Sequence, residues 1–267
     1  MAPKTVLVTG CSAGGIGAAV ALALAQRGHH VFATARAVSK IPPGLSELAN
    51  VTSLHLDVTS SESVAQAAQA VAASGRGLDI LLNNAGAGYA MPVLDIDISK
   101  AQRLYDVNVW GPIRTVQGFA NLLIASHGRI VNISTVGAVI NTPWISTYAS
   151  SKAALTNYSE TMRLELAPLG VTVVTLMIGA VDSHFHDNEP DFALPSVSRY
   201  APIEEIIAGW ANGSAKPKGC SADQLAESLV DNIINGKTAV AYKGPHAGSM
   251  KFISKWAPQS LSVSASF

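Results

Sequence analysis

The feature that most restricts the fold of this chain is a glycine-rich turn near its N-terminus. The turn reads Thr9-Gly10-Cys11-Ser12-Ala13-Gly14-Gly15-Ile16-Gly17, and it joins an apolar, strand-like run at 5–9 to an alanine-rich, helix-like segment at 18–27. Glycine permits both a sharp reversal of the chain and a close approach of a phosphate to the backbone. We therefore predict a dinucleotide site whose phosphates lie at the helix N-terminus. The candidate cofactor residues of the turn are Gly10, Ser12, Gly15, Ile16 and Gly17.

The rest of the chain repeats the alternation of strand and helix. Apolar runs predict further strands at 31–34, 51–56, 78–82, 130–133, 171–178 and 238–242. Helices are expected from Thr59, where Glu62 completes a capping box, from near Asp97 or Ser99 toward Ser126, around Tyr148, and at 222–235. Continuous apolar strands between helices are typical of a parallel sheet covered on both faces. We predict an α/β fold, a Rossmann-type doubly wound parallel sheet, in a single domain spanning residues 1–267.

One segment interrupts this pattern. Residues 182–220 mix polar, aromatic and proline residues without a long period, so we expect a loop and short-helix insertion over the mouth of the active site. His184 and His186 are interpreted as polar loop residues rather than ligands. Because residues 182–198 contain no Lys or Arg, the insertion favours an uncharged substrate.

Composition and charge restrict the partners. The chain has 48% hydrophobic and 13% charged residues and a formal net charge of zero, which disfavours nucleic acid and favours a small, largely uncharged ligand. Cys11 and Cys220 are far apart in sequence and lack metal-ligand spacing, so we expect a reduced cytoplasmic protein without disulfides or a metal site. The N-terminus lacks a secretory signal, and no apolar run approaches the ~20 residues that span a membrane.

A tyrosine and a lysine suggest the chemistry. Tyr148 and Lys152 lie four residues apart on an expected helix, so they share a face, and the ammonium is expected to lower the phenol pKa by about 1–3 units. Such a phenol can exchange a proton near neutral pH. The pair alone is common on ordinary helices. Combined with the glycine-rich turn and with Asn83-Asn84-Ala85-Gly86, which follows an expected strand, it predicts a nicotinamide-dependent oxidoreductase.

The residues after the second strand indicate which nicotinamide cofactor is used. An acidic residue there favours NAD, whereas a basic residue accommodates the 2′-phosphate of NADP. The chain has Ala35-Arg36 at this point and no Asp or Glu before Ser46, so we predict NADP(H); a solvated surface arginine is the alternative. Asp57 follows the third strand and either contacts the adenine amino group or begins the next helix cap, and the two roles are compatible.

The motifs together resemble the classical short-chain dehydrogenase/reductase family over nearly the whole chain. Within that family, the turn and Tyr242-Lys243-Gly244 are similar to the fungal 1-acyldihydroxyacetone-phosphate reductase branch. Besides the turn, Asp57, Tyr148 and Lys152, the resemblance rests on Asn83 to Gly86, Asn108-Val109-Trp110-Gly111, Ser134-Thr135 and Gly179-Ala180-Val181.

The resemblance implies roles for individual residues. Tyr148 would be the proton donor to a carbonyl, and Lys152 would lower the pKa of Tyr148 and bind the nicotinamide ribose. Asn108 would hold a water that links Lys152 to solvent. The remaining implied cofactor contacts are Val58, Asn84, Ala85, Gly86, Gly179, Val181 and Ser183. The family also implies a homodimer or homotetramer, with helices at 105–123 and 148–166 in the interface.

The chain departs from the family pattern in three places. The turn has four residues between Gly10 and Gly15 instead of the usual three, so it must bulge. Thr135 stands at the position of the family's catalytic serine, thirteen residues before Tyr148. Ser134 is the alternative, but successive strand residues point to opposite faces and only one of the two can face a substrate. Finally, Ile178 replaces a usual proline and Ser183 a frequent threonine.

These observations lead to one expected function and two alternatives. We expect NADPH-dependent, reversible reduction of a ketone to a secondary alcohol, on a hydrophobic substrate such as a polyketide- or terpenoid-like intermediate. The first alternative is a lipid reductase acting on an acyldihydroxyacetone phosphate. The second, of another class, is a non-catalytic NADP(H)-binding regulator, which the presence of both Tyr148 and Lys152 disfavours.

Overall fold

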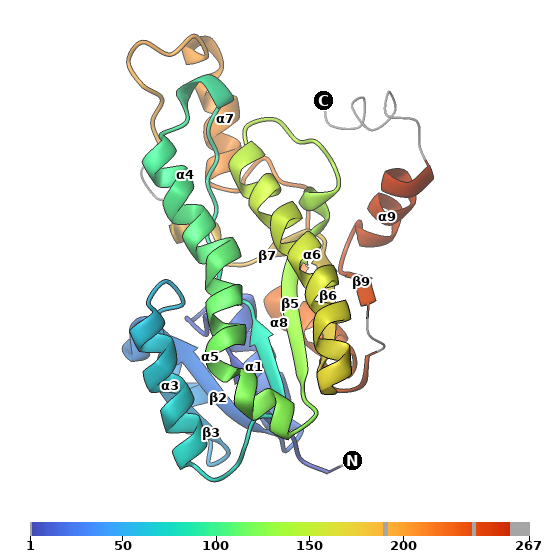
Figure 1. Ribbon diagram of the computed structural model, residues 1–267. Helices are drawn as coiled ribbons and strands as arrows, with labels where there is room; N and C mark the ends of the chain where they lie inside the picture. The colour runs from blue at the N-terminus through green and yellow to red at the C-terminus, as the bar shows by residue number, and fades with distance from the viewer. Residues whose placement is uncertain (1, 189–191, 237–238, 257–267) are drawn as a thin grey trace.

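The computed structural model describes residues 2–188, 192–236 and 239–256 (Figure 1). Within these residues, seven parallel strands form one sheet in the order β3-β2-β1-β4-β5-β6-β9. The direction of winding reverses between β1 and β4, and ligands of such sheets bind in the crevice at this switch point. The strands are β1 (Thr5–Val8), β2 (His30–Ala35), β3 (Val51–His55), β4 (Ile80–Asn83), β5 (Arg129–Thr135), β6 (Thr172–Ile178) and β9 (Ala239–Lys243).

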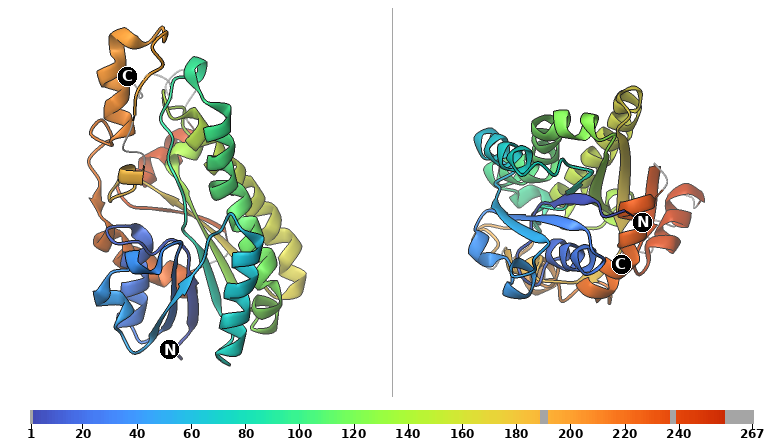
Figure 2. Two further views of the ribbon diagram at one scale, coloured as in Figure 1. Left: turned by 90° about the vertical axis from the view of Figure 1, so that its left-hand side faces the viewer. Right: turned by 90° about the horizontal axis from the view of Figure 1, so that it is seen from below.

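Helices cover both faces of the sheet (Figure 2). Val6 and Val8 face one layer, whereas Leu7 between them faces the other, because successive strand residues alternate in direction. The first layer contains α1 (Ile16–Gln26) and α8 (Ala222–Asn235). The second contains α3 (Ser61–Ala73), α5 (Gly111–Ala125) and α6 (Ser146–Leu166). The predicted doubly wound α/β fold is therefore confirmed.

The helix expected from Asp97 toward Ser126 is interrupted. The Asp97 side chain accepts hydrogen bonds from the N–H groups of Ser99 and Lys100 and thus caps α4 (Ile98–Tyr105). A π-helical turn at Asp106–Trp110 then separates α4 from α5. Such turns are rare and often lie at functional sites, and this one carries Asn108.

The predicted capping box of Thr59 and Glu62 is wrong. Ser60 is the N-cap of α3, and its hydroxyl accepts a hydrogen bond from the Ser63 N–H at 3.2 Å. Thr59 instead donates its own N–H and hydroxyl to Asp57 Oδ1, at 2.9 and 2.8 Å. The Asp57 carboxylate therefore stabilises a turn at residues 57–59, and α3 begins only after this turn.

We call residues 182–220 the flap; residues 189–191 within it lie outside the described residues. The described part of the flap rises above the carboxyl edge of the sheet (Figure 1). The base of the flap is held by pairing of β7 (Val181–Asp182) with β8 (Cys220–Ser221) and by an ion pair between Asp182 and Lys216. The flap contains α7 (Glu204–Ala211) and short 3₁₀ turns. The other short elements are α2 (Pro43–Ser46), α9 (Ala247–Trp256) and 3₁₀ turns at Val38–Lys40, Val93–Asp95, Val136–Ala138 and Ala167–Leu169.

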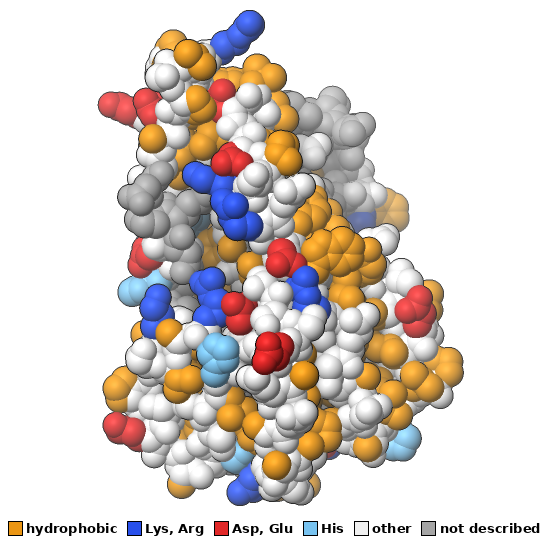
Figure 3. Space-filling model, turned by 60° about the vertical axis from the view of Figure 1, so that its left-hand side comes forward, with side chains coloured by type: hydrophobic (Ala, Val, Ile, Leu, Met, Phe, Trp, Pro, Cys, Tyr) orange, Lys and Arg blue, Asp and Glu red, His pale blue; other side chains and the backbone are white. Residues whose placement is uncertain are grey.

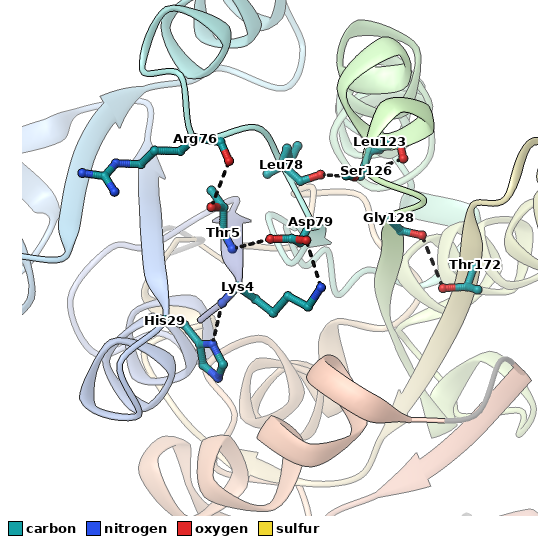
Figure 4. Close-up of polar contacts among 10 residues, drawn as sticks. All are labelled: Lys4, Thr5, His29, Arg76, Leu78, Asp79, Leu123, Ser126, Gly128 and Thr172. Carbon is teal, nitrogen blue, oxygen red and sulfur yellow. Dashed lines mark hydrogen bonds and ion pairs between the residues drawn. The ribbon is translucent and has the colours of Figure 1, made fainter. Parts of the chain in front are cut away.

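At the opposite edge of the sheet, where the strands begin, polar contacts connect neighbouring segments of the chain (Figure 4). The Asp79 carboxylate accepts hydrogen bonds from the Thr5 N–H at 2.8 Å and from Lys4 Nζ at 3.0 Å. The Lys4 N–H donates to His29 Nδ1 at 3.1 Å. None of the predicted site residues lies here, so this edge serves the fold. No described helix combines the length and apolar character that a membrane span requires.

Candidate active site

The glycine-rich turn packs directly against the end of β4. Gly10 has a φ of +76°, and a Cβ there would lie 2.9 Å from the Ala85 Cα; a Cβ at Gly17 would overlap the Asn84 side-chain amide. That amide donates to the carbonyl oxygens of Thr9 and Gly10 at 2.9 and 3.2 Å. The structure thus brings the turn together with Asn84, Ala85 and Gly86 at the switch point of the sheet. The open, backbone-lined turn at the start of α1 fits a dinucleotide diphosphate.

Cys11 within this turn has a packing role. Its side chain is fully buried, and its Sγ lies 3.3 Å from the Val8 carbonyl oxygen. Burial raises the pKa of the thiol to about 12, so it stays protonated and unreactive.

Arg36 and Asp57 lie near each other at the ends of β2 and β3. The Arg36 side chain is exposed and makes no hydrogen bond or ion pair with any described residue. Burial acts to raise the pKa of Asp57, but hydrogen bonds from Thr59 and the charge of Arg36 outweigh it, so the pKa lies below its ordinary value. The Val58 carbonyl next along the chain accepts a hydrogen bond from Arg114 Nη1 at 3.0 Å.

The two candidate hydroxyls at the end of β5 face different surroundings. The Ser134 hydroxyl is buried beneath α6, 2.8 Å from Thr156 Oγ1 and 3.3 Å from the Lys152 carbonyl oxygen. The Thr135 hydroxyl instead hydrogen-bonds to the Tyr148 phenol and lies 3.3 Å from the Ile178 carbonyl oxygen. The geometry therefore favours Thr135 as the hydroxyl that works with Tyr148.

The expected lowering of the Tyr148 pKa by Lys152 is wrong. Burial raises the pKa of Tyr148 to about 12, against the opposing hydrogen bond from Thr135, and burial also lowers the pKa of Lys152 to about 8. Lys152 Nζ donates to the Ile133 carbonyl oxygen at 3.0 Å. Burial is the dominant cause in both residues, because taking either charge out of water is costly, and Lys152 is not among the groups that shift the Tyr148 pKa. Near neutral pH the phenol is protonated, which is the state that a proton donor requires.

Asn108 joins the π-helical turn to the site. Its side chain is fully buried; Oδ1 accepts from the Ala87 N–H at 2.9 Å, and Nδ2 donates to the Ala87 carbonyl oxygen and to Ser151 Oγ, both at 3.0 Å. A Cβ at Gly86 would lie 3.4 Å from both Asn108 Oδ1 and Lys152 Nζ. The Asn108 side chain is thus engaged with the loop that follows β4 and with Ser151 of α6, and both hydrogens of its Nδ2 are used.

Gly179, Val181 and Ser183 follow β6 at the same edge of the sheet. The Gly179 N–H donates to the Lys243 carbonyl oxygen at 2.9 Å, and a Cβ at Gly179 would overlap the Pro245 carbonyl oxygen. Glycine is therefore required here by the close passage of the chain after β9. Val181 pairs in β7, which directs Ser183 and the residues after it toward the glycine-rich turn.

Apolar residues beside Tyr148 were not identified from the sequence. The Tyr148 ring lies 5.5 Å, centroid to centroid, from Phe185 of the flap. It also packs against a buried cluster of Tyr89, Met91 and Leu104, to which the flap adds Phe192 and Leu194. The sequence showed that the insertion contains aromatic and aliphatic residues. It could not show that they pack against Tyr148, because that contact depends on tertiary structure.

Comparisons with known proteins agree with this geometry. The family model for short chain dehydrogenase matches residues 4–192. The chain is 43% identical over 262 residues to the short-chain dehydrogenase PC-15 of Penicillium crustosum, covering 98% of this chain and 96% of that protein. It is 40% identical to the NADPH-dependent 1-acyldihydroxyacetone phosphate reductase of Schizosaccharomyces pombe, covering 87% and 79%. A Burkholderia cenocepacia short chain dehydrogenase solved with NADP has a TM-score of 0.77 at 25% identity, covering 98% and 97%.

The fold and the site define an oxidoreductase of the nicotinamide-dependent kind, which acts on CH–OH and C=O groups. The glycine-rich turn, the switch-point crevice and the Tyr148–Lys152 pair are all at one edge of the sheet. The chain belongs to the short-chain dehydrogenase family, as the sequence resemblance predicted, and a fungal acyldihydroxyacetone phosphate reductase is among its relatives.

Proposed function

We propose that this protein is an NADPH-dependent carbonyl reductase that converts a hydrophobic, natural-product-like ketone reversibly into a secondary alcohol. The observation that carries the proposal is the hydrogen bond between Thr135 and the protonated Tyr148 phenol, with Lys152 four residues further along α6. Two hydroxyl groups thereby converge where a carbonyl oxygen would have to lie.

Each of these residues has a separate task. Tyr148 gives its phenolic proton to the carbonyl oxygen, and Thr135 donates a hydrogen bond to the same oxygen as negative charge develops there. Lys152 supplies a positive charge behind the phenol, and Asn108 keeps the loop at Gly86 in place beside it. Bound NADPH supplies the hydride.

The preference for NADPH is assigned to Arg36. Its exposed guanidinium stands at the end of β2 and has no competing partner among the described residues, so it is available to a 2′-phosphate. The cofactor residues proposed for the diphosphate, adenosine and nicotinamide portions are those of the turn, Asp57 with Val58, Asn84 to Gly86, and Gly179, Val181 and Ser183, together with Tyr148 and Lys152.

An uncharged substrate is favoured by the surroundings of Tyr148. Phe185, Met91 and Leu194 are apolar. Of the flap cations, Lys216 is paired with Asp182, and Arg199 and Lys218 are the other two. The lipid-reductase alternative rests on the 40% identical relative. Of the two substrate classes, only the acyldihydroxyacetone phosphate carries a charged phosphate group, so charge at the mouth of the site distinguishes them.

The test is NADPH oxidation measured against a panel of ketones that includes bulky polycyclic ketones and an acyldihydroxyacetone phosphate. We expect the highest kcat/KM with an uncharged hydrophobic ketone. The highest value with the acyl phosphate would support the lipid-reductase alternative. NADPH binding without turnover of any ketone would support the non-catalytic regulator.

We also propose a homodimer or homotetramer in the cytoplasm. Exposed hydrophobic side chains lie on α4, on the π-helical turn after it and on α6, including Ile98, Trp110, Tyr158 and Leu164. Trp110 and Tyr158 are in edge-to-face contact with ring centroids 6.0 Å apart. Figure 3 shows a broad hydrophobic patch to the right of its centre. Light scattering on the intact protein tests the assembly, and a monomeric mass at micromolar concentration would contradict it.

A further inference from the structure

Aromatic residues are concentrated around the phenol of Tyr148. The chain has 4 Trp, 6 Tyr and 6 Phe residues. Among the residues that the structure describes, seven of these lie beside the phenol or on the loops that surround it: Tyr89, Tyr105, Trp144, Tyr148 itself, Phe185, Phe192 and Tyr200. The surface next to the phenol is therefore aromatic and not only apolar.

Phe185 of the flap rests on a glycine. One edge of its ring faces Gly88, where a Cβ would lie 2.9 Å from Phe185 Cε1 and 3.3 Å from Cζ. The φ of Gly88 lies outside the left-handed region, so it is the space for the ring, and not the backbone, that requires glycine here. The Tyr148 ring lies 5.5 Å away, centroid to centroid, at an angle of 57°, and the Phe185 side chain is half-buried. The Phe185 ring is thus placed beside the phenol and stays partly accessible.

Trp144 is held near the same site in a strained backbone conformation. It lies two residues before α6 begins and has a φ of +69°, which is unfavourable for a side chain of this size and is found mainly at functional sites. Its carbonyl oxygen accepts a hydrogen bond from the Met91 N–H at 2.6 Å. Its ring is in edge-to-face contact with Tyr200 of the flap, with centroids 5.5 Å apart. The loops after β4 and β5 and the flap therefore combine to surround the site with aromatic rings.

We propose that the substrate is a planar aromatic ketone whose ring packs against Phe185, an inference that deepens the proposed function and rests on it. A ketone whose oxygen meets the Tyr148 phenol carries its carbon skeleton past Phe185, because the Phe185 ring lies next to the phenol. Aromatic rings attract one another in offset-stacked or edge-to-face arrangements, with centroids about 4.5–7 Å apart. Phe185 is thus a specificity-determining residue that selects an aromatic skeleton over a saturated one of the same size.

Two bicyclic ketones test this selection. 2-Tetralone and trans-2-decalone share one carbon skeleton and have an unconjugated carbonyl group, but only 2-tetralone contains an aromatic ring. Wild type should have the higher kcat/KM with 2-tetralone. Phe185→Leu keeps an apolar side chain and removes the aromatic face, so the ratio of the two kcat/KM values should fall by about two- to tenfold, the range for one aromatic pair. Because the contact is present before and during reduction, the change should appear in KM rather than kcat.

Phe185→Tyr is the conservative variant. It keeps an aromatic ring and should retain the wild-type ratio of the two kcat/KM values. The Kd for NADPH and the Tm are measured on the same samples, so that a loosened flap is recognised. A loss of kcat/KM in Phe185→Leu by the same factor for both ketones would show that Phe185 only supports the fold of the flap, and would overturn the proposal.

Gly88→Ala tests the position of the ring while the ring is still present. The added methyl group would meet Phe185 Cε1 at 2.9 Å, so the ring must move, and the ratio should fall as it does in Phe185→Leu. Leucine has neither a Cε1 nor a Cζ atom. In the Phe185→Leu background, Gly88→Ala should therefore change the ratio by less than about twofold. Equal effects in the two backgrounds would show that the methyl group acts on something other than Phe185, and would overturn the proposal.

Gly44→Ala is the matched control for the glycine substitution. Gly44 lies in α2, and apart from its chain neighbours and the backbone of its own helix, no described atom lies within 4 Å of the added methyl group. Both kcat/KM values should stay within about twofold of wild type. A fall in the ratio as large as that of Gly88→Ala would contradict the role of the Phe185 contact.

The remaining outcomes separate the inference from the proposed function. If wild type reduces trans-2-decalone at least as efficiently as 2-tetralone, or if Phe185→Leu leaves the ratio unchanged, the inference is overturned and the proposed function stands. Wild type that binds NADPH but reduces no ketone would overturn the proposed function and the inference with it.

Discussion

Replacing Thr135 by valine tests which hydroxyl at the end of β5 takes part in catalysis. The change keeps the shape of the side chain and removes the oxygen that hydrogen-bonds to Tyr148. If this hydroxyl stabilises the developing charge on the carbonyl oxygen, its loss should lower kcat by about 10²–10³, or about 2.7–4 kcal/mol. Thr135→Ser retains the donor and should stay active.

Ser134→Ala is the control at the neighbouring strand position, because it also removes a hydroxyl that makes hydrogen bonds within the protein. The contacts of Ser134 are Thr156 Oγ1 and the Lys152 carbonyl oxygen, whereas those of Thr135 include the Gly137 N–H and the Ile178 carbonyl oxygen. Each lost hydrogen bond costs about 1 kcal/mol of stability, so the two variants should lose about 1–3 kcal/mol alike. They should differ in turnover and not in stability.

The assay is initial-rate NADPH oxidation at saturating ketone, with thermal unfolding measured on the same samples. A crippled Ser134→Ala with a normal Thr135→Val would refute the reasoning. It would mean that the strand presents the opposite face to the substrate. An equal loss of turnover in both variants would indicate a general disturbance of β5 and would also contradict the assignment.

Three further predictions concern charge. Arg36→Ala should raise the Kd for NADPH by at least tenfold and that for NADH by less than twofold, and equal losses in a binding titration would refute its role at the 2′-phosphate. Because the pKa of Lys152 is about 8, kcat for ketone reduction should fall as pH rises above 8; a flat pH–rate profile from 7 to 9 would contradict the need for its charge. Burial and the charge of Arg27 lower the pKa of His29, whose Nδ1 accepts a hydrogen bond from the Lys4 N–H. The unfolded chain therefore takes up a proton at a higher pH than the folded protein does, and stability should decline as pH falls below about 6.5. His29→Asn retains an acceptor and should flatten the dependence of Tm on pH between 7 and 5; an unchanged slope would assign the decline to other groups.

The sequence was sufficient to predict the parts of the molecule that depend on local pattern. Continuous apolar runs marked the strands of the sheet, and the span expected at 222–235 agrees with α8. The alternation of strand residues also separated Ser134 from Thr135, since a one-residue shift changes the face. Glycine spacing located the turn, in which Gly10 and Gly14 both have a positive φ.

Features that depend on tertiary packing were missed or predicted wrongly. Spacing on a helix placed Lys152 near Tyr148, but the pKa of each follows burial under neighbouring elements, which sequence does not state. The π-helical turn at Asn108 interrupts a segment that the sequence pattern presents as one continuous helix. The sequence pattern predicted Thr59 as the helix cap. In the structure the Thr59 hydroxyl donates to Asp57 instead, and Ser60 is the cap. In the same way, the contact of Phe185 with Tyr148 arises from how the flap folds over the sheet.

The measurement that tests the central claim most directly is single-turnover ketone reduction by Tyr148→Phe with NADPH already bound. The phenylalanine ring keeps the contact with Phe185, and only the proton-donating oxygen is lost. The account predicts that the rate falls by about 10²–10⁴, the usual contribution of a general acid, while the Kd for NADPH stays within about twofold of wild type. A variant that reduces the ketone at the wild-type rate would show that Tyr148 is not the proton donor.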